Sequence, residues 1–109
     1  MNCNVYTVAP FERQAKRLSK KYPSLKTDLV DLITKLESQP TLGIGFGNNC
    51  YKIRFAITSK GKGKSGGARV ITYYLISKNS VYLLSIYDKS QYETISDSVL
   101  KDLLKLIKT

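Results

Sequence analysis

The sequence contains no histidine and no tryptophan, and only two cysteines and one methionine, among 109 residues. Without histidine the usual general base near neutral pH is missing, so any acid–base step must use Lys, Tyr, Asp or Glu. Cys3 and Cys50 stand far apart and form no metal-ligand pattern. Each borders a predicted strand, which favours two small buried thiols in a reducing compartment over a disulfide.

Long apolar runs are also missing. No segment approaches the roughly 20 apolar residues that cross a membrane, and the segment Met1–Tyr6 lacks the charged and apolar parts of a signal peptide. We therefore expect a cytoplasmic protein with no membrane contact. The length predicts a single domain, residues 1–109, and the apolar content of 42% is sufficient for one modest core.

Acidic residues are scarce, with 8 Asp and Glu against 18 Lys and Arg, and the formal net charge is +10. The interval between Glu37 and Asp88 contains no acidic residue. It holds seven cationic residues: Lys52, Arg54, Lys60, Lys62, Lys64, Arg69 and Lys78. A surface of one sign attracts a polyanion. Because the charge is clustered, RNA is favoured as a partner over a merely basic protein without an anionic ligand.

Hydrophobic periodicity predicts an α+β fold. Alternation and β-branching predict a first strand at 4–8, and apolar spacings of three and four predict two helices, which end before Pro23 and Pro40. Three β-rich segments, 51–57, 69–76 and 81–87, predict further strands, the last two joined by a tight turn. An apolar stripe of Ile95, Val99, Leu103, Leu106 and Ile107 predicts a C-terminal helix capped by Thr94 or Ser96. The order is β-α-α-β-β-β-α, with two N-terminal helices packed on a mainly antiparallel sheet.

Two glycine-rich segments interrupt this pattern. The first, residues 41–49, has no strand before it and no helix after it, so it is not a phosphate-binding fingerprint. We expect its apolar residues Leu42, Ile44 and Phe46 to lie against the core. The second segment, residues 58–67, is either a mobile clamp on phosphate or a solvated hairpin loop. It carries Lys60, Lys62 and Lys64.

The cations of the predicted sheet converge. Lys52 and Arg54 are two residues apart on one strand and therefore share a face. Arg69 begins the next strand, where a hairpin brings it near Arg54, and Lys89 borders the same surface, flanked by Tyr87 and Tyr92. Cations beside aromatic rings suit single-stranded RNA, because charge binds phosphate and rings stack on bases. The basic face of the first helix is either a solvated surface or a second RNA contact, through Arg13, Lys16, Arg17 and Lys20.

The same cations can also support RNA cleavage. When a 2′-hydroxyl attacks the adjacent phosphorus, negative charge builds on the phosphoryl oxygens, and fixed cations stabilise it. A lysine whose pKa is lowered by neighbouring cations can accept the 2′-hydroxyl proton, and a lysine or tyrosine can protonate the leaving oxygen. This chemistry needs no metal and no cofactor. From these residues alone, RNA binding and RNA cleavage remain equally open.

Several segments resemble the RelE/HigB toxins of bacterial type II toxin–antitoxin systems, and HigB-like members in particular. They are the helical run from Phe11 to Tyr22, the strand Tyr51-Lys-Ile-Arg, the run Gly63-Lys-Ser-Gly-Gly-Ala-Arg-Val-Ile-Thr-Tyr-Tyr and the segment Leu84-Ser-Ile-Tyr-Asp-Lys-Ser. The resemblance implies a ribosome-dependent mRNA endonuclease, an mRNA interferase, that cuts in the ribosomal A site. It also implies a cognate HigA-like antitoxin and a toxin that is monomeric outside the antitoxin complex.

The resemblance also implies roles for individual residues. Lys52 and Arg54 match the family's basic pair, Arg69 the arginine aimed at the scissile phosphate, and Lys89 a further cation. Ile95 stands where some members have a tyrosine, and Tyr92 or Tyr87 are the substitutes. Two alternatives remain: a ParE-like toxin that inhibits a topoisomerase, and an RNA-binding domain without catalysis.

Overall fold

The computed structural model describes residues 2–91 and 95–107. Its elements, in chain order, are β1 (Asn4–Thr7), α1 (Ala9–Lys21), α2 (Leu25–Ser38), β2 (Ile44–Gly45), β3 (Cys50–Phe55), the short 3-10 turn η1 (Thr58–Lys60), β4 (Ala68–Leu75), the turn η2 (Ile76–Lys78), β5 (Ser80–Asp88) and α3 (Asp97–Leu104). The predicted α+β order is confirmed, with the two-residue strand β2 as an addition.

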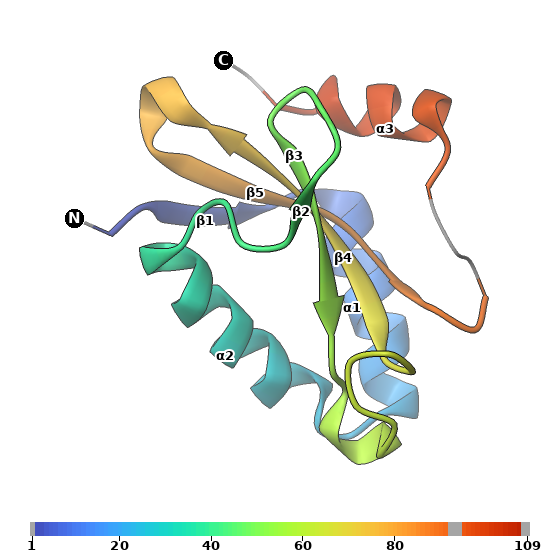
Figure 1. Ribbon diagram of the computed structural model, residues 1–109. Helices are drawn as coiled ribbons and strands as arrows, with labels where there is room; N and C mark the ends of the chain where they lie inside the picture. Colours follow the sequence, from blue (N-terminus) through green and yellow to red (C-terminus); the bar gives the residue numbers. More distant parts are fainter. Residues whose placement is uncertain (1, 92–94, 108–109) are drawn as a thin grey trace.

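The strands form one sheet in the order β1-β5-β4-β3-β2. β1 runs parallel to β5, and the other neighbours are antiparallel, as predicted for a mainly antiparallel sheet. The helices α1 and α2 form a hairpin that packs beside the sheet (Figure 1). Their buried side chains join the strands in the core: Phe11, Leu25, Leu32 and Leu36.

The two faces of the sheet differ in chemistry. Along β3 the side chains of Tyr51, Ile53 and Phe55 alternate with those of Cys50, Lys52 and Arg54, so the latter three share the opposite face. Tyr73 of β4 is the register partner of Cys50, and it lines a hollow with Leu104 and Ile107 of the C-terminal region. α3 therefore covers one end of the face that carries the cations. The loop 61–67 lies at the other end of the molecule (Figure 1).

The C-terminal helix differs in phase from the prediction. Leu100, Leu103 and Ile107 are buried, whereas Val99 and Leu106 are 47% and 50% exposed. The predicted stripe counted from Ile95, but that residue precedes the helix, which begins at Asp97. Ser96 is the N-cap, and its hydroxyl accepts a hydrogen bond from Val99 N at 3.3 Å. The alternative cap, Thr94, lies outside the described residues.

The glycine-rich connection 41–49 corrects a second expectation. Leu42 packs against the core, but Ile44 is 64% and Phe46 43% exposed. The reason is that Ile44 and Gly45 pair with Lys52 and Tyr51 of β3. This pairing turns Ile44 toward the face of Lys52 instead of the core.

The cysteines agree with the prediction. Cys3 and Cys50 are both buried free thiols. Cys3 Sγ donates a hydrogen bond to Leu36 O at 3.0 Å, and burial raises the pKa of the Cys50 thiol to about 11. Among the residues that the structure describes, no helix has the length and apolar character needed to cross a membrane.

Candidate nucleic-acid interface

Three cations meet on the sheet at the end that α3 leaves open. Arg54 is paired in register with Arg69, and Lys52 lies two residues earlier on the same face of β3. We call Lys52, Arg54 and Arg69 the cationic face. Like charges placed directly opposite each other on neighbouring strands destabilise a sheet. A sheet that places two arginines opposite each other gains stability when an anion binds between them.

Arg69 is held in place by the backbone. Its side chain is only 6% exposed, and Nη1 donates to Lys64 O and Ala68 O, both at 3.1 Å. Its Nε and Nη2 groups make no hydrogen bond to another described residue. A guanidinium carries five N–H donors in a rigid fork that matches phosphate oxygens. One edge of Arg69 is thus fixed by the protein through Nη1.

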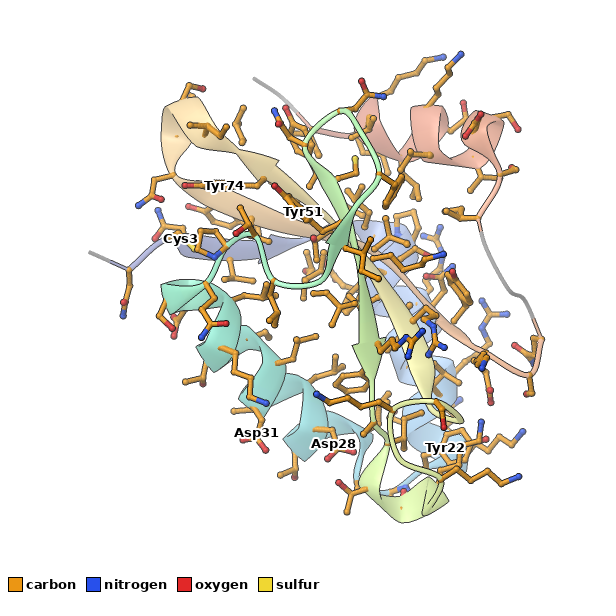
Figure 2. All side chains as sticks on the ribbon, viewed as in Figure 1. Cys3, Tyr22, Asp28, Asp31, Tyr51 and Tyr74 are labelled. Carbon is orange, nitrogen blue, oxygen red and sulfur yellow. The ribbon has the colours of Figure 1, made fainter. Side chains whose placement is uncertain are left out.

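The loop 61–67 supplies one of those carbonyls, so the anchoring of the loop matters for Arg69. At its start, the turn η1 is held by Asp28, whose carboxylate accepts from Thr58 N at 2.9 Å and Thr58 Oγ1 at 2.7 Å. Ser59 N donates to Ser24 Oγ at 2.8 Å. Burial acts to raise the pKa of Asp28, but the hydrogen bonds that its carboxylate accepts from Thr58 and from Ser24 Oγ outweigh it, and the pKa is lowered. Figure 2 shows Tyr22 and Asp28 beside this turn.

A buried ion pair holds the same turn from the sheet side. Lys60 Nζ lies 2.7 Å from Asp88 Oδ1, with the two side chains 12% and 1% exposed. Tyr22 Oη donates to Asp88 Oδ2 at 3.0 Å, and Ser90 donates to Oδ1 through both N and Oγ. Burial alone would raise the pKa of Asp88, but the hydrogen bonds from Lys60, Ser90 and Tyr22 bring it well below its usual range. The sequence predicted that Lys60 binds RNA, but its ammonium group forms a buried ion pair with Asp88 instead.

The far end of the loop is fixed by close backbone packing. Gly67 O accepts a hydrogen bond from Lys89 N at 3.2 Å. A Cβ at Gly67 would lie 2.1 Å from Phe55 O, so no other residue fits there. Between these anchored ends, Lys62 and Lys64 are exposed, and so is Lys89. The three lysines extend the positive charge beyond the cationic face.

Two tyrosines, Tyr87 and Tyr92, were predicted to lie beside the cations and to stack on RNA bases or share in catalysis. Tyr87 is the register partner of Arg69 but is only 7% exposed, so its ring offers no surface for a base. Burial raises the pKa of its hydroxyl, although the charge of Arg69 acts in the opposite direction. Tyr92, predicted as a catalytic residue, lies outside the described residues.

A groove follows β3 beyond the short strand β2. Its volume is about 530 Å³, and Lys52, Arg54 and Lys64 line one side. Asp31 and Lys35 of α2 line the other side.

The cations predicted on α1 do not line this groove. Exposed on that helix are Arg13, Lys16, Arg17 and Lys20. Arg17 borders a separate hollow beside Tyr87 and Asp88. Among residues 2–91 and 95–107, no three His, Cys, Asp or Glu side chains form a group that would hold a metal ion.

Comparison with solved structures identifies the architecture. A double arginine-to-alanine mutant of E. coli toxin RelE in the free state superposes with a TM-score of 0.64, with 14% sequence identity over 99% of this chain and 100% of that chain. The isolated E. coli RelE toxin gives 0.53, with 16% identity over 96% and 99% of the two chains. This chain has the RelE fold. No family model matches the sequence.

A third RelE structure contains a partner. The same E. coli RelE mutant in complex with an antitoxin RelBc peptide superposes with a TM-score of 0.51, with 18% identity over 99% of this chain and 100% of that chain. The RelE fold that the sequence motifs predicted is therefore confirmed. In this version of the RelE fold, the cationic face lies on β3 and β4, and the loop between these two strands supports it.

Proposed function

We propose that this protein is the toxin of a type II toxin–antitoxin system and acts as an endoribonuclease on mRNA in the ribosomal A site. One observation carries the proposal: the guanidinium of Arg69 is fixed by two carbonyls and keeps Nε and Nη2 for a phosphate, directly opposite Arg54. A surface that only attracts RNA needs exposed charge, as on Lys62. A buried and oriented guanidinium is suited to charge that develops at one atom.

The proposed reaction is transesterification within the RNA strand. The 2′-oxygen bonds to the adjacent phosphorus while the bond from phosphorus to the 5′-oxygen breaks. The products are a 2′,3′-cyclic phosphate and a 5′-hydroxyl. Arg69 and Arg54 stabilise the negative charge on the non-bridging oxygens. A base takes the proton of the 2′-hydroxyl and an acid supplies one to the 5′-oxygen. The candidates for these two roles are Lys52, two residues before Arg54 on the same face of β3, and Lys89, the residue that follows β5.

An antitoxin is the second part of the proposal. The RelE neighbour in complex with an antitoxin peptide supports a protein partner for this chain as well. The formal net charge of +10 favours an antitoxin that brings acidic residues to the cationic face.

Primer extension on a defined mRNA tests the activity. With programmed ribosomes, the purified protein should produce cuts at the A-site codon that are absent without protein. Cuts on free RNA would make it a nuclease that needs no ribosome. If neither condition yields cuts, the nuclease proposal is wrong, and a topoisomerase inhibition assay becomes the next measurement.

Salt dependence measures the contribution of individual cations to RNA binding. Replacing Lys52 with methionine should lower RNA affinity several-fold and reduce the slope of log affinity against log salt by roughly 0.7, because one phosphate contact on a single strand is lost. Lys26→Met is the matched control, since Lys26 is an exposed lysine of α2 outside the cationic face. Equal slopes for the two variants would exclude Lys52 from the phosphate contacts. The measurement is fluorescence anisotropy of a labelled oligoribonucleotide at several salt concentrations.

A further inference from the structure

We propose that Phe46, supported by Ile44, is a stacking site for one nucleobase of the RNA whose phosphates lie on the cationic face. The proposal depends on RNA binding at that face, and it does not depend on cleavage. It begins from the exposed side chains of the β2–β3 hairpin. Ile44 is 64% and Phe46 43% exposed, although both belong to a segment with the apolar pattern of a core element.

The sheet register places these side chains beside the cations. Ile44 is the direct partner of Lys52. Phe46 N donates to Cys50 O at 3.1 Å, so Phe46 stands opposite Cys50, two residues from Lys52 along β3. Paired residues share a face of the sheet, and Cys50, Lys52 and Arg54 therefore share theirs with Ile44 and Phe46. Along this face the exposed apolar side chains of the hairpin come first. Lys52 follows, and then the two opposed arginines, Arg54 and Arg69.

The backbone of the hairpin fixes the outward direction of the Ile44 and Phe46 side chains. Gly43 has φ +100°, and a Cβ there would lie 2.6 Å from Lys52 O. On the other side of Phe46, Asn48 and Asn49 adopt the left-handed conformation, with φ of 54° and 58°. Such angles are uncommon for residues other than glycine, although asparagine tolerates them best. Ile44 and Phe46 are thus held outward by a defined backbone.

The chemistry of the neighbourhood selects a nucleobase as the occupant. Two residues of β3 span roughly 7 Å, which is comparable to the step between phosphates of an extended single strand. A strand with one phosphate at the two arginines and the next at Lys52 places a base near the hairpin. Every base has a π-face that stacks on an aromatic ring, while charge holds the backbone. Tyr87, the aromatic residue expected from the sequence to stack, is buried, and Phe46 supplies an exposed ring on the same face.

Binding of a fluorescent RNA tests the site. The probe is a 2′-O-methyl oligoribonucleotide, which has no free 2′-hydroxyl and cannot be cleaved, with 2-aminopurine at successive positions. Phe46→Ala should lower affinity roughly 5- to 100-fold and abolish the fluorescence quenching at one position. Phe46→Tyr keeps a ring and should retain the affinity and the quenching. Val30→Ala is the control, because Val30 is 61% exposed on α2 and lies outside the hairpin.

Thermal unfolding of each variant verifies that the fold is intact. The proposal is overturned if Phe46→Ala binds like Val30→Ala, if Phe46→Tyr loses as much affinity as Phe46→Ala, or if the wild-type protein does not bind the probe. The outcomes also separate this site from the nuclease activity. Loss of quenching in Phe46→Ala together with an absence of mRNA cuts by the wild type would support the stacking site and reject the nuclease. Normal mRNA cuts by the wild type together with unchanged RNA binding in Phe46→Ala would support the nuclease and reject the stacking site.

Discussion

Replacing Arg69 with alanine should lower the rate of RNA cleavage roughly 100- to 1,000-fold, because removal of one preorganised donor to a developing oxyanion has an effect of this size. RNA affinity should fall only a few-fold, since Arg69 is one cation among many on a chain with 18 Lys and Arg. An interaction that acts mainly in the transition state changes kcat more than binding. Single-turnover cleavage on programmed ribosomes and anisotropy on free RNA provide the two quantities.

Two further variants serve as controls for Arg69→Ala. Arg69→Lys retains the charge but loses the planar guanidinium, which donates to two carbonyls and, in the proposed reaction, to a phosphate. Most of the activity should therefore still be lost. Arg13→Ala removes an exposed arginine of α1 and should cleave at close to the wild-type rate on free RNA or ribosomes. If Arg69→Ala lost affinity and cleavage in equal proportion, Arg69 would be a binding residue only, and the domain would be better described as an RNA-binding module.

The arrangement of Arg69 opposite Arg54 was accessible from the sequence because a hairpin between two strongly patterned strands restricts the register. The partner of Lys60 was not accessible. Asp88 is 28 residues away, and only the tertiary fold brings the end of β5 beneath η1. The available signal was weak: Asp88 is the first acidic residue after the acid-free interval, and it ends a strand.

Exposure was harder to predict than secondary structure. Tyr87 belongs to β5, which lies between β1 and β4 and is buried along almost its whole length. A strand covered on both faces does not alternate between apolar and polar residues, so its sequence cannot show which side chains reach the solvent. The opposite error occurred at Phe46, because the apolar pattern of residues 42–46 indicated burial, and the pairing of two residues with β3 decided otherwise.

Replacing Lys60 with methionine should lower the free energy of unfolding by about 3–5 kcal/mol, because it leaves the carboxylate of Asp88 buried without its cation. Lys62→Met is the matched control. Lys62 is exposed in the loop 61–67, two residues after Lys60, and its replacement should change stability by no more than about 0.5 kcal/mol. Urea unfolding of the three proteins at neutral pH gives the comparison. A Lys60→Met variant as stable as Lys62→Met would show that Tyr22 and Ser90 alone suffice to stabilise the carboxylate.

The pH dependence identifies Asp88 as the group responsible. Its pKa in the folded protein lies below the value of about 3.9 expected in the unfolded chain, so its stabilising contribution is complete above that value and is lost as the pH falls toward the folded pKa. In Lys60→Met the strongest hydrogen bond to the carboxylate is gone, and protonation relieves the buried charge. The stability difference between wild type and Lys60→Met should therefore be largest near neutral pH and shrink below about pH 4. A difference that did not vary with pH would indicate lost packing of the lysine side chain instead.

The same variant connects stability to the proposed catalysis. Lys60 anchors η1, the loop 61–67 follows η1 directly, and Lys64 O in that loop accepts a hydrogen bond from Arg69. If the position of Arg69 depends on this chain of contacts, Lys60→Met at a temperature where it remains folded should reduce the cleavage rate without a matching loss of RNA affinity. Lys62→Met should show the opposite pattern, because it removes an exposed charge and leaves the anchor intact. A loss of affinity alone in both variants would mean that the loop contributes charge to RNA binding and does not position Arg69.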